Sequence, residues 1–335
     1  MNKRERVITA LEHKDTDFVP YHLRFTKPER RAFAEFTGVS DPETHFGNHI
    51  DIAYSTDFMT EPEPGMFKDE FGVVWDRRDG ADIGMPEPVL KGPSFDGYVF
   101  PGPVENEIAA QLENFKSAPW DTFRMVAVGF TFYERAWSMR GLEATLEDML
   151  LEEDFFTELL DRIVDYNIAV MDSVRKHCDD FDAFYFGDDW GSQRGLVMGA
   201  PLWRKLIRPG MAKLIGHAKK CGKYTFLHSC GDIYEIFPDL IEIGLDVYDT
   251  FQPEVYPIRE VKEKYGDKLS FLGGISIQAL LPFASPEVVE STTKEIMEIM
   301  GKSGGFIAAP THDMTPDIPA ENVEAMIRAF QNQRS

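Results

Sequence analysis

Short apolar runs alternate with longer helical patterns through the second half of the chain. Residues 224–227 form one such run, and others follow at 245–252, 269–275 and 304–309. Short apolar runs bounded by turn residues are typical of buried strands, whereas apolar residues spaced three or four apart are typical of helices. The alternation predicts parallel strands joined by helices.

Helical patterns fill the gaps between these runs. Residues 233–241 and 259–268 have helical spacing, and Ser285 with Pro286 predicts the start of a helix that ends near Gly301. Farther upstream, residues 153–177 and 201–221 read as two longer helices. Each predicted helix therefore connects two predicted strands.

Earlier strands are predicted at 182–187, 126–129 and 18–23. A chain of 335 residues with at least six strand–helix repeats has the usual size of a closed (β/α)8 TIM barrel. We therefore expect a single TIM-barrel domain over residues 1–335. An open doubly wound sheet is the alternative, but the chain has no Gly-x-Gly-x-x-Gly turn that opens a helix.

Residues 58–103 do not fit the repeat. The segment contains seven prolines and several glycines, and its short apolar stretch at 73–75 suggests short strands. We interpret it as a looped insertion, and in a barrel we expect it to cover the mouth of the pocket.

The end of the strand predicted at 224–227 carries the most distinctive chemistry. His228 and Cys230 are two residues apart, so on a strand their side chains point to the same face. Gly231 permits a sharp turn, and Asp232 is a good N-cap for the following helix. An imidazole and a thiolate side by side could begin a zinc site, although a buried cysteine is often just a small apolar residue.

His312 follows the strand predicted at 304–309, and Asp188 follows the one at 182–187. In a parallel barrel the active site lies at the carboxyl ends of the strands, where both residues and the His228–Cys230 pair fall. We therefore predict a zinc ion bound by His228, Cys230 and His312. The alternative is that the two histidines are hydrogen-bonded pocket residues that serve acid–base chemistry.

Further candidates lie at predicted strand ends. Asp188 or Asp189 would be a fourth metal ligand or a carboxylate that orients a histidine, and capping a loop is the alternative. His22 is a candidate catalytic residue that could equally be a hydrogen-bonded core histidine. The candidate pocket-lining residues, which could instead pack in the core, are Trp190, Tyr248 and Gln252.

Composition narrows the class of protein. Asp plus Glu number 57 against 35 Lys plus Arg, a formal charge of -22, which argues against binding to nucleic acid or an anionic membrane. The three cysteines are too scattered for a disulfide framework, and no apolar run approaches the length of a membrane span. We expect a cytoplasmic protein without a signal peptide.

Several motifs, taken together, resemble the uroporphyrinogen decarboxylase and cobalamin-dependent methyltransferase superfamily. They occur in family order over most of the chain. They are Arg4-Glu5-Arg6-Val7, Phe132-Tyr133-Glu134-Arg135-Ala136-Trp137, Asp188-Asp189-Trp190-Gly191, the 228–232 tip and Phe271-Leu272-Gly273-Gly274-Ile275. The resemblance implies a TIM barrel and suggests a homodimer.

The two branches of this superfamily make different demands. The decarboxylase branch has an N-terminal Arg-Gln-Ala-Gly-Arg motif for substrate carboxylates, where this chain has residues 21–25 with Arg24 alone to bind substrate. The methyltransferase branch implies zinc held by a His-x-Cys pair and a later Cys, and His312 stands in the place of that Cys. Imidazole is a competent zinc ligand, so the site would be His, Cys, His.

Three functions follow from the resemblance. The first is a zinc-dependent methyltransferase that moves a methyl group between a small molecule and a corrinoid protein. The second is a carboxy-lyase that needs no metal, and the third is a non-catalytic corrinoid-binding barrel. A metal assay separates the first two.

Overall fold

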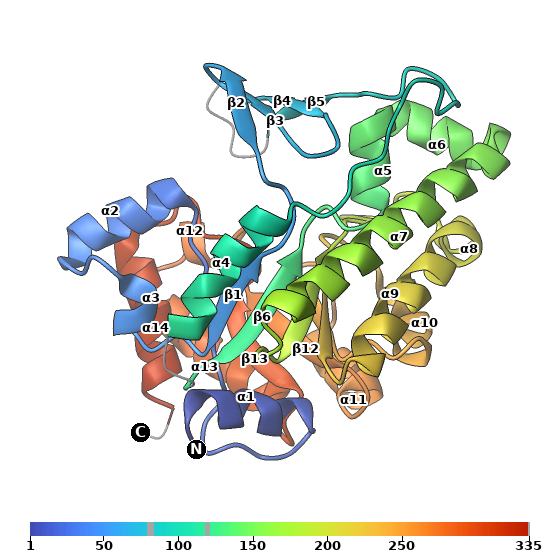
Figure 1. Ribbon diagram of the computed structural model, residues 1–335. Helices are drawn as coiled ribbons and strands as arrows, with labels where there is room; N and C mark the ends of the chain where they lie inside the picture. Colours follow the sequence, from blue (N-terminus) through green and yellow to red (C-terminus); the bar gives the residue numbers. More distant parts are fainter. Residues whose placement is uncertain (79–83, 118–120, 334–335) are drawn as a thin grey trace.

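A parallel sheet forms the centre of the protein, in a computed structural model that describes residues 1–78, 84–117 and 121–333. Its seven strands have the order β1-β6-β7-β10-β11-β12-β13, and every neighbouring pair is parallel. Figure 1 shows the curled sheet with its helices outside. The strands are β1 (Ile50–Tyr54), β6 (Phe123–Val128), β7 (Ala183–Gly187), β10 (Tyr224–His228), β11 (Val247–Phe251), β12 (Ser270–Ile275) and β13 (Phe306–Pro310).

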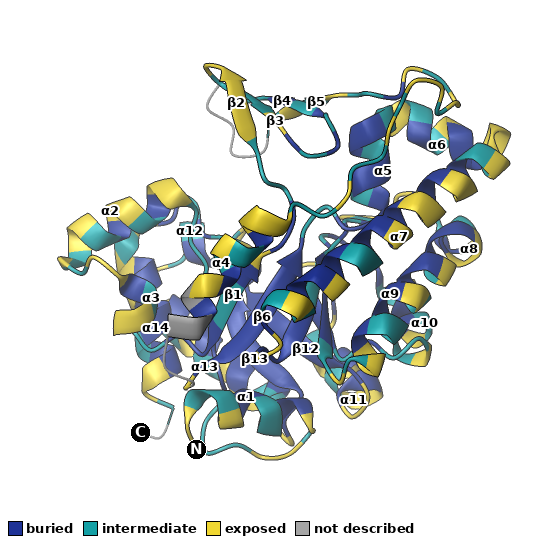
Figure 2. Cartoon of the chain, viewed as in Figure 1, coloured by how far each residue is buried: buried dark blue, intermediate teal, exposed yellow. Residues whose placement is uncertain are grey.

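Helices surround the sheet and turn their apolar faces to it. Figure 2 shows buried strands at the centre and exposed residues on the outer helix faces. The helices between and after the strands are α4 (Glu105–Ser117), α5 (Tyr133–Arg140), α6 (Leu142–Leu151), α7 (Glu153–His177), α8 (Ala200–Leu202), α9 (Arg208–Lys220), α10 (Phe237–Glu242), α11 (Ile258–Tyr265), α12 (Leu280–Phe283), α13 (Pro286–Met300) and α14 (Ala320–Gln331). This arrangement confirms the predicted α/β class of parallel strands covered by helices.

Alternate strand residues fill the interior of the curled sheet. Phe123, Phe226 and Val247 belong to a buried cluster that is separate from the larger core between strands and helices. Helix α1 (Lys3–Leu11) adds Val7 and Leu11 to the inner cluster, so it plugs the end where the strands begin. The polar site is therefore confined to the opposite end, where the strands finish.

The segment predicted as a strand at 18–23 forms a single bridge, between Tyr21 and Ala308 of β13. His22 N–H donates to Ala308 O at 2.9 Å, and His49 N–H, just before β1, donates to Tyr21 O at 3.2 Å. Pro20 has no N–H for a longer ladder, so pairing stops there. The segment nevertheless lies between β13 and β1 and joins the two edges of the sheet.

Several other elements differ from the expectation. Strand β1 was not predicted, and α2 (Lys27–Thr37) and α3 (Pro42–His45) follow the bridge segment. The helix expected at 201–221 is interrupted by a π-helical turn over Trp203–Ile207, which ends just before Pro209 removes a helical N–H. The helix expected at 233–241 begins as a 3₁₀ turn, Tyr234–Ile236, before α10.

The insertion at 58–103 holds a four-stranded antiparallel sheet of β2 (Thr60–Glu63), β3 (Met66–Lys68), β4 (Val74–Asp76) and β5 (Met85–Glu87). Residues 79–83 of the insertion lie outside the described residues. The sheet follows the carboxyl end of β1 and lies above the strand ends in Figure 1. The Trp75 ring stacks on Phe130 just beyond β6, at 4.9 Å between centroids. Covering of the pocket mouth stays a prediction.

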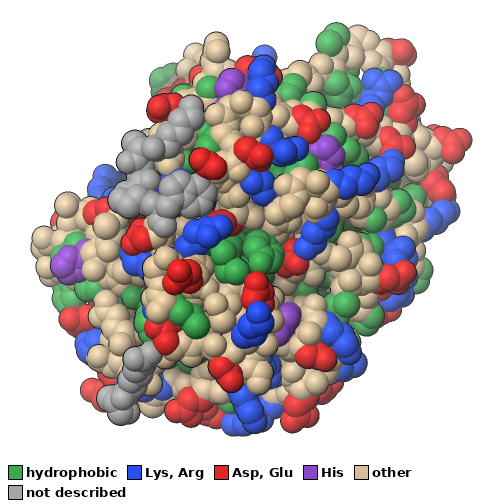
Figure 3. All heavy atoms as spheres, turned by 60° about the horizontal axis from the view of Figure 1, so that its bottom comes forward, with side chains coloured by type: hydrophobic (Ala, Val, Ile, Leu, Met, Phe, Trp, Pro, Cys, Tyr) green, Lys and Arg blue, Asp and Glu red, His purple; other side chains and the backbone are tan. Residues whose placement is uncertain are grey.

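The surface shows no concentration of basic charge on the face drawn in Figure 3. Acidic and basic side chains are interspersed there. Within the described ranges, no helix combines the length and the apolarity that crossing a membrane requires.

Candidate active site at the carboxyl ends of the strands

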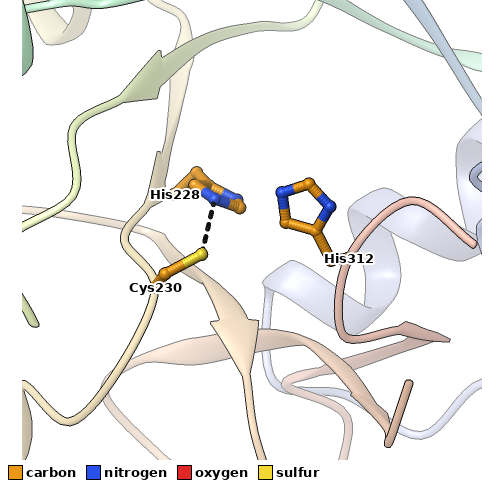
Figure 4. A group of neighbouring side chains, drawn as sticks. All are labelled: His228, Cys230 and His312. Atoms are coloured by element: carbon orange, nitrogen blue, oxygen red, sulfur yellow. Dashed lines mark hydrogen bonds between the residues drawn. The ribbon is translucent and has the colours of Figure 1, made fainter. Parts of the chain in front are cut away.

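His228, Cys230 and His312 converge at the end of the barrel where the strands finish. One ligand atom from each lies within 4.8 Å of the others. His228 Nε2 is 3.4 Å from Cys230 Sγ, and the two imidazole rings meet edge to face with centroids 5.5 Å apart. Figure 4 shows the His228–Cys230 pair on one side and His312 entering from the other. The structure thus brings together the three residues predicted to bind zinc.

Asp249 on β11 fixes the orientation of His228. The His228 Nδ1–H donates to Asp249 Oδ2 at 3.0 Å, which leaves Nε2 facing Cys230. Asp249 is fully buried and also accepts hydrogen bonds from Tyr185 Oη at 2.6 Å and from Arg24 Nη1. Histidines that bind a metal commonly donate their other ring N–H to a carboxylate in this way, which fixes the orientation of the ring.

The charges around Asp249 reinforce this arrangement. Burial alone would raise the pKa of Asp249, but Arg24 and His228 outweigh it and hold that pKa well below its usual range. Burial would likewise lower the pKa of His228, yet the bonds to Asp249 and Cys230 raise it well above the ordinary value. A metal ion would therefore have to displace a proton from this group of residues.

The loop that carries Cys230 is held through its backbone. Ser229 N–H donates to Asp249 O at 2.6 Å, Cys230 N–H to Asp189 Oδ1 at 2.7 Å, and Gly231 N–H to Gln252 Oε1 at 2.7 Å. Gly231 has a φ of +79°, and a Cβ on it would lie 2.5 Å from the carbonyl carbon of Gly191. The predicted sharp turn at Gly231 is present, and the thiol has a fixed position.

Three of the predicted pocket residues lie behind this loop. Tyr248 and Trp190 are fully buried, and Gln252 is 4% exposed. Tyr248 Oη donates to Ser229 O at 2.7 Å. All three residues hold the loop from behind. Contact between these residues and a substrate remains a prediction.

The two adjacent aspartates have different surroundings. Asp188 is fully buried and accepts from the N–H groups of Tyr133 and Glu134 at the start of α5, and burial raises its pKa to about 7. Asp189 Oδ1 lies 3.6 Å from His228 Nε2, and its side chain is 39% exposed. Asp189 is thus the aspartate adjacent to the metal-capable group, whereas Asp188 caps a helix.

A pocket of about 340 Å³ is lined in part by Arg24 and Tyr185, which both donate hydrogen bonds to Asp249. His22, Arg24, Tyr185 and Asp313 line it, and Asp313 directly follows His312. His22 Nδ1 bonds to Asn48 Oδ1 at 3.1 Å, which leaves Nε2 as an acceptor, and burial followed by the charge of Arg24 lowers the pKa of His22 to about 4. His22 is therefore a neutral base at the pocket wall.

Sequence reasoning did not identify Asp249, Tyr185 or Glu134. Val247 and Asp249 share the inward face of β11 by strand alternation, so a carboxylate two residues after a buried valine was a usable signal. Burial and the charges of Asp189 and Asp188 raise the pKa of Glu134 well above its ordinary value. Its proximity to these carboxylates arises from tertiary packing of α5.

The donor set suits zinc. Two imidazoles and one thiol are the ligands that Zn²⁺ takes in catalytic sites, where a fourth position stays open. The His228 Nε2 to Cys230 Sγ distance of 3.4 Å already matches the spacing of roughly 3.3–3.6 Å between ligands of a tetrahedral ion. Bringing His312 to the same spacing would need a shift of about 1 Å.

Known proteins resemble this chain in sequence and in fold. Residues 111–333 match the family model described as uroporphyrinogen decarboxylase (URO-D). The chain is 26% identical over 183 residues to a uroporphyrinogen decarboxylase of Magnetococcus marinus, covering 52% of this chain and 48% of that protein. It is also 26% identical over 133 residues to a methylated-thiol–coenzyme M methyltransferase of Methanosarcina mazei, covering 40% of this chain and 34% of that protein.

The matched regions span about half or less of these two relatives. A solved structure, a methyltransferase from Methanosarcina mazei, matches over 100% of both chains with a TM-score of 0.75 at 17% identity, which shows a shared fold. Because the family model covers well over half of the chain, this protein belongs to the uroporphyrinogen decarboxylase family.

Proposed function

We propose that this protein is a zinc-dependent methyltransferase that moves a methyl group between a small molecule and a corrinoid on a partner protein. The observation that carries the proposal is the convergence of His228, Cys230 and His312. The methyltransferases among its relatives support the same reaction class.

The residues present would divide the work as follows. His228, Cys230 and His312 would hold the ion, and Asp249 would keep His228 in the tautomer that presents Nε2. When bound, zinc would act as a Lewis acid that stabilises negative charge on a substrate sulfur or oxygen. His22 Nε2 would accept a hydrogen bond from a substrate group that enters the pocket.

The charge of the pocket argues against the decarboxylase reaction. A substrate with several carboxylates needs several cationic partners, because unpaired charge in a pocket is costly. Arg24 is the one arginine among the described lining residues, and it already pairs with Asp249 and Asp313. The methyltransferase proposal makes no such demand.

Metal content of three cysteine and histidine variants tests the proposal. Cys230→Ser should lose zinc and methyl transfer while keeping its fold. His312→Cys should retain zinc, since thiolate is also a zinc ligand. Cys221→Ser is the matched control, because Cys221 lies outside the site with Arg175 as its partner. Elemental analysis and methyl transfer from a methylcorrinoid protein are the measurements.

Two results would overturn the proposal. Protein purified with zinc available could contain no metal, or Cys230→Ala could keep both metal and activity. Either would make metal-free acid–base chemistry by His22 and its neighbours the better explanation.

A further inference from the structure

The pocket of about 340 Å³ carries more negative than positive side chains. Glu43, Asp51 and Asp313 line it, and Arg24 is the single basic residue among the described lining residues. Two lining residues connect the pocket to the candidate site: Asp313 follows His312 in the chain, and Tyr185 Oη donates to the carboxylate of Asp249, which also bonds to His228. A molecule that occupies this pocket lies among these charges and close to Asp249, the partner of His228.

Arg24 has little positive charge left to offer a substrate. Its Nη1 donates to both oxygens of Asp249, at 3.0 and 2.9 Å, and its Nε donates to Asp313 at 3.2 Å. The side chain is 11% exposed. Two carboxylates thus face one guanidinium. The positive charge of Arg24 is therefore already neutralised before an anion could approach it.

The remaining carboxylates keep this balance negative. Glu43 pairs with Arg30 at 2.9 Å, but Arg30 also pairs with Asp41 at 3.1 Å. Asp51 accepts from the neutral hydroxyl of Thr122 at 2.5 Å. Two arginines, together with His228 beside Asp249, therefore face five carboxylates in and around the pocket, and the carboxylates remain in excess.

Aromatic rings complete the wall. Phe25, Tyr54 and Tyr185 line the same pocket, and Tyr54 is 57% exposed at its rim. Aromatic faces attract cations and contribute little to binding anions. Carboxylates and aromatic rings around one cavity form the usual combination for recognising an ammonium group.

We propose that the substrate of this site carries a positively charged group, a primary or quaternary ammonium, that lies between Asp51, Asp313 and the tyrosines. Its sulfur or oxygen end reaches His228, Cys230 and His312. The identity of the reacting end rests on the function proposed above, whereas the charge of the other end rests on the pocket alone.

Three thiols, each with two CH2 groups between the sulfur and the polar head group, test the charge preference. Cysteamine, 2-mercaptoethanol and 3-mercaptopropionate are titrated against the cobalt(II)-substituted protein, where the sulfur-to-cobalt absorption band reports binding. Cysteamine should bind about tenfold more tightly than 3-mercaptopropionate, with the neutral thiol between them. Asp51→Asn should narrow this ratio, while Asp161→Asn, an exposed change on α7 where Asp161 pairs with Lys213, should not.

A second titration separates this inference from the proposed function. Ethylammonium and propionate are compared on the metal-free 335-residue protein by saturation-transfer NMR. Preference for ethylammonium supports the inference even if cobalt does not bind. Failure to bind cobalt would contradict the zinc proposal alone. Cobalt binding with 3-mercaptopropionate preferred, or with 2-mercaptoethanol bound as tightly as cysteamine, overturns the cationic assignment and leaves the zinc proposal standing.

Discussion

Gly231 is the residue on which the position of the Cys230 thiol most directly depends. Its φ of +79° favours glycine, and the backbone of Gly191 lies where a side chain would begin. Because the loop is bonded at Ser229, Cys230 and Gly231, it cannot move aside without breaking hydrogen bonds to Asp249, Asp189 or Gln252. A small change here should therefore affect both stability and metal binding.

We predict that Gly231→Ala lowers the free energy of unfolding by roughly 2 to 4 kcal/mol, from backbone strain and overpacking, and weakens zinc binding. Gly216→Ala in α9 is the matched control. A Cβ there would meet nothing within 4 Å, and alanine should stabilise the helix by about 0.5 to 1 kcal/mol. Urea unfolding and a zinc chelator competition are the measurements, and equal effects of the two substitutions would contradict the prediction.

Residue spacing was enough to predict the metal-capable group but not its support. His228 and Cys230 are close in sequence, and the strand-end rule for barrels placed His312 beside them. Asp249 shares its carboxylate with Arg24 and Tyr185, which come from distant segments, so no local pattern shows the network. Asp188 ends a strand as predicted, but its partners on α5 are visible only after folding.

At the scale of elements, one arginine attaches the insertion to the barrel. Arg135 on α5 is 1% exposed and pairs with Asp57 and Asp69, each at 2.5 Å. Asp57 precedes the small sheet, and Asp69 lies between its second and third strands. Removing the guanidinium would leave buried carboxylates without a cationic partner.

Arg135→Met should destabilise the protein by about 3 to 5 kcal/mol, the usual effect of breaking a buried ion pair from one side. It should also make residues 58–103 an early target of limited proteolysis. Arg78→Met is the control, because Arg78 is 64% exposed and its pair with Asp76 should contribute at most about 1 kcal/mol. If both variants melt and digest alike, Arg135 does not anchor the insertion.

The contact of α1 with the start of β1 predicts a pH dependence of stability. Arg6 Nη1 donates to His49 Nε2 at 2.9 Å, and burial with the charge of Arg6 lowers the pKa of His49 to about 3. His22 behaves alike, with a pKa of about 4. Unfolded histidines titrate near 6.5, so below that pH the unfolded chain binds more protons and stability falls.

As the pH falls from 6 to 5, each of these histidines should lower the free energy of unfolding by about 1.4 kcal/mol. Most carboxylates titrate below this pH range. His49→Gln keeps an acceptor for Arg6 and should reduce the slope of unfolding free energy against pH by one such increment. Chemical denaturation at several pH values measures it. Parallel profiles for the variant and the wild type would mean that His49 is protonated in the folded protein.

Elements with strong internal periodicity were predicted well, and those defined by distant partners were not. Helix α7 has the predicted bounds, because its apolar spacing is regular over its whole length. Strand β1 was missed since Asp51 interrupts a short run, and it is recognisable as a strand chiefly by its register with β6. The bridge at Tyr21 was read as a strand because its apolar residues are local, whereas its partner Ala308 is remote.

For the whole molecule, the important relation is that His228 and His312 come from opposite sides of the barrel mouth. His228 ends β10 and His312 follows β13, and strands β11 and β12 lie between them in the sheet. An ion bound by both would connect segments that are far apart in sequence. Its binding energy would therefore add to global stability and not only to the order of one loop.

Zinc at 100 times its dissociation constant should stabilise the folded protein by about 2.7 kcal/mol, which for a chain of this length raises Tm by about 4 °C. A chelator should reverse the shift, and Cys230→Ser should show none. Hydrogen exchange should slow together in β10 and β13, because the ion joins their ends. A Tm shift of equal size in Cys230→Ser would place the bound zinc elsewhere, and slower exchange in β10 alone would exclude His312 as a ligand.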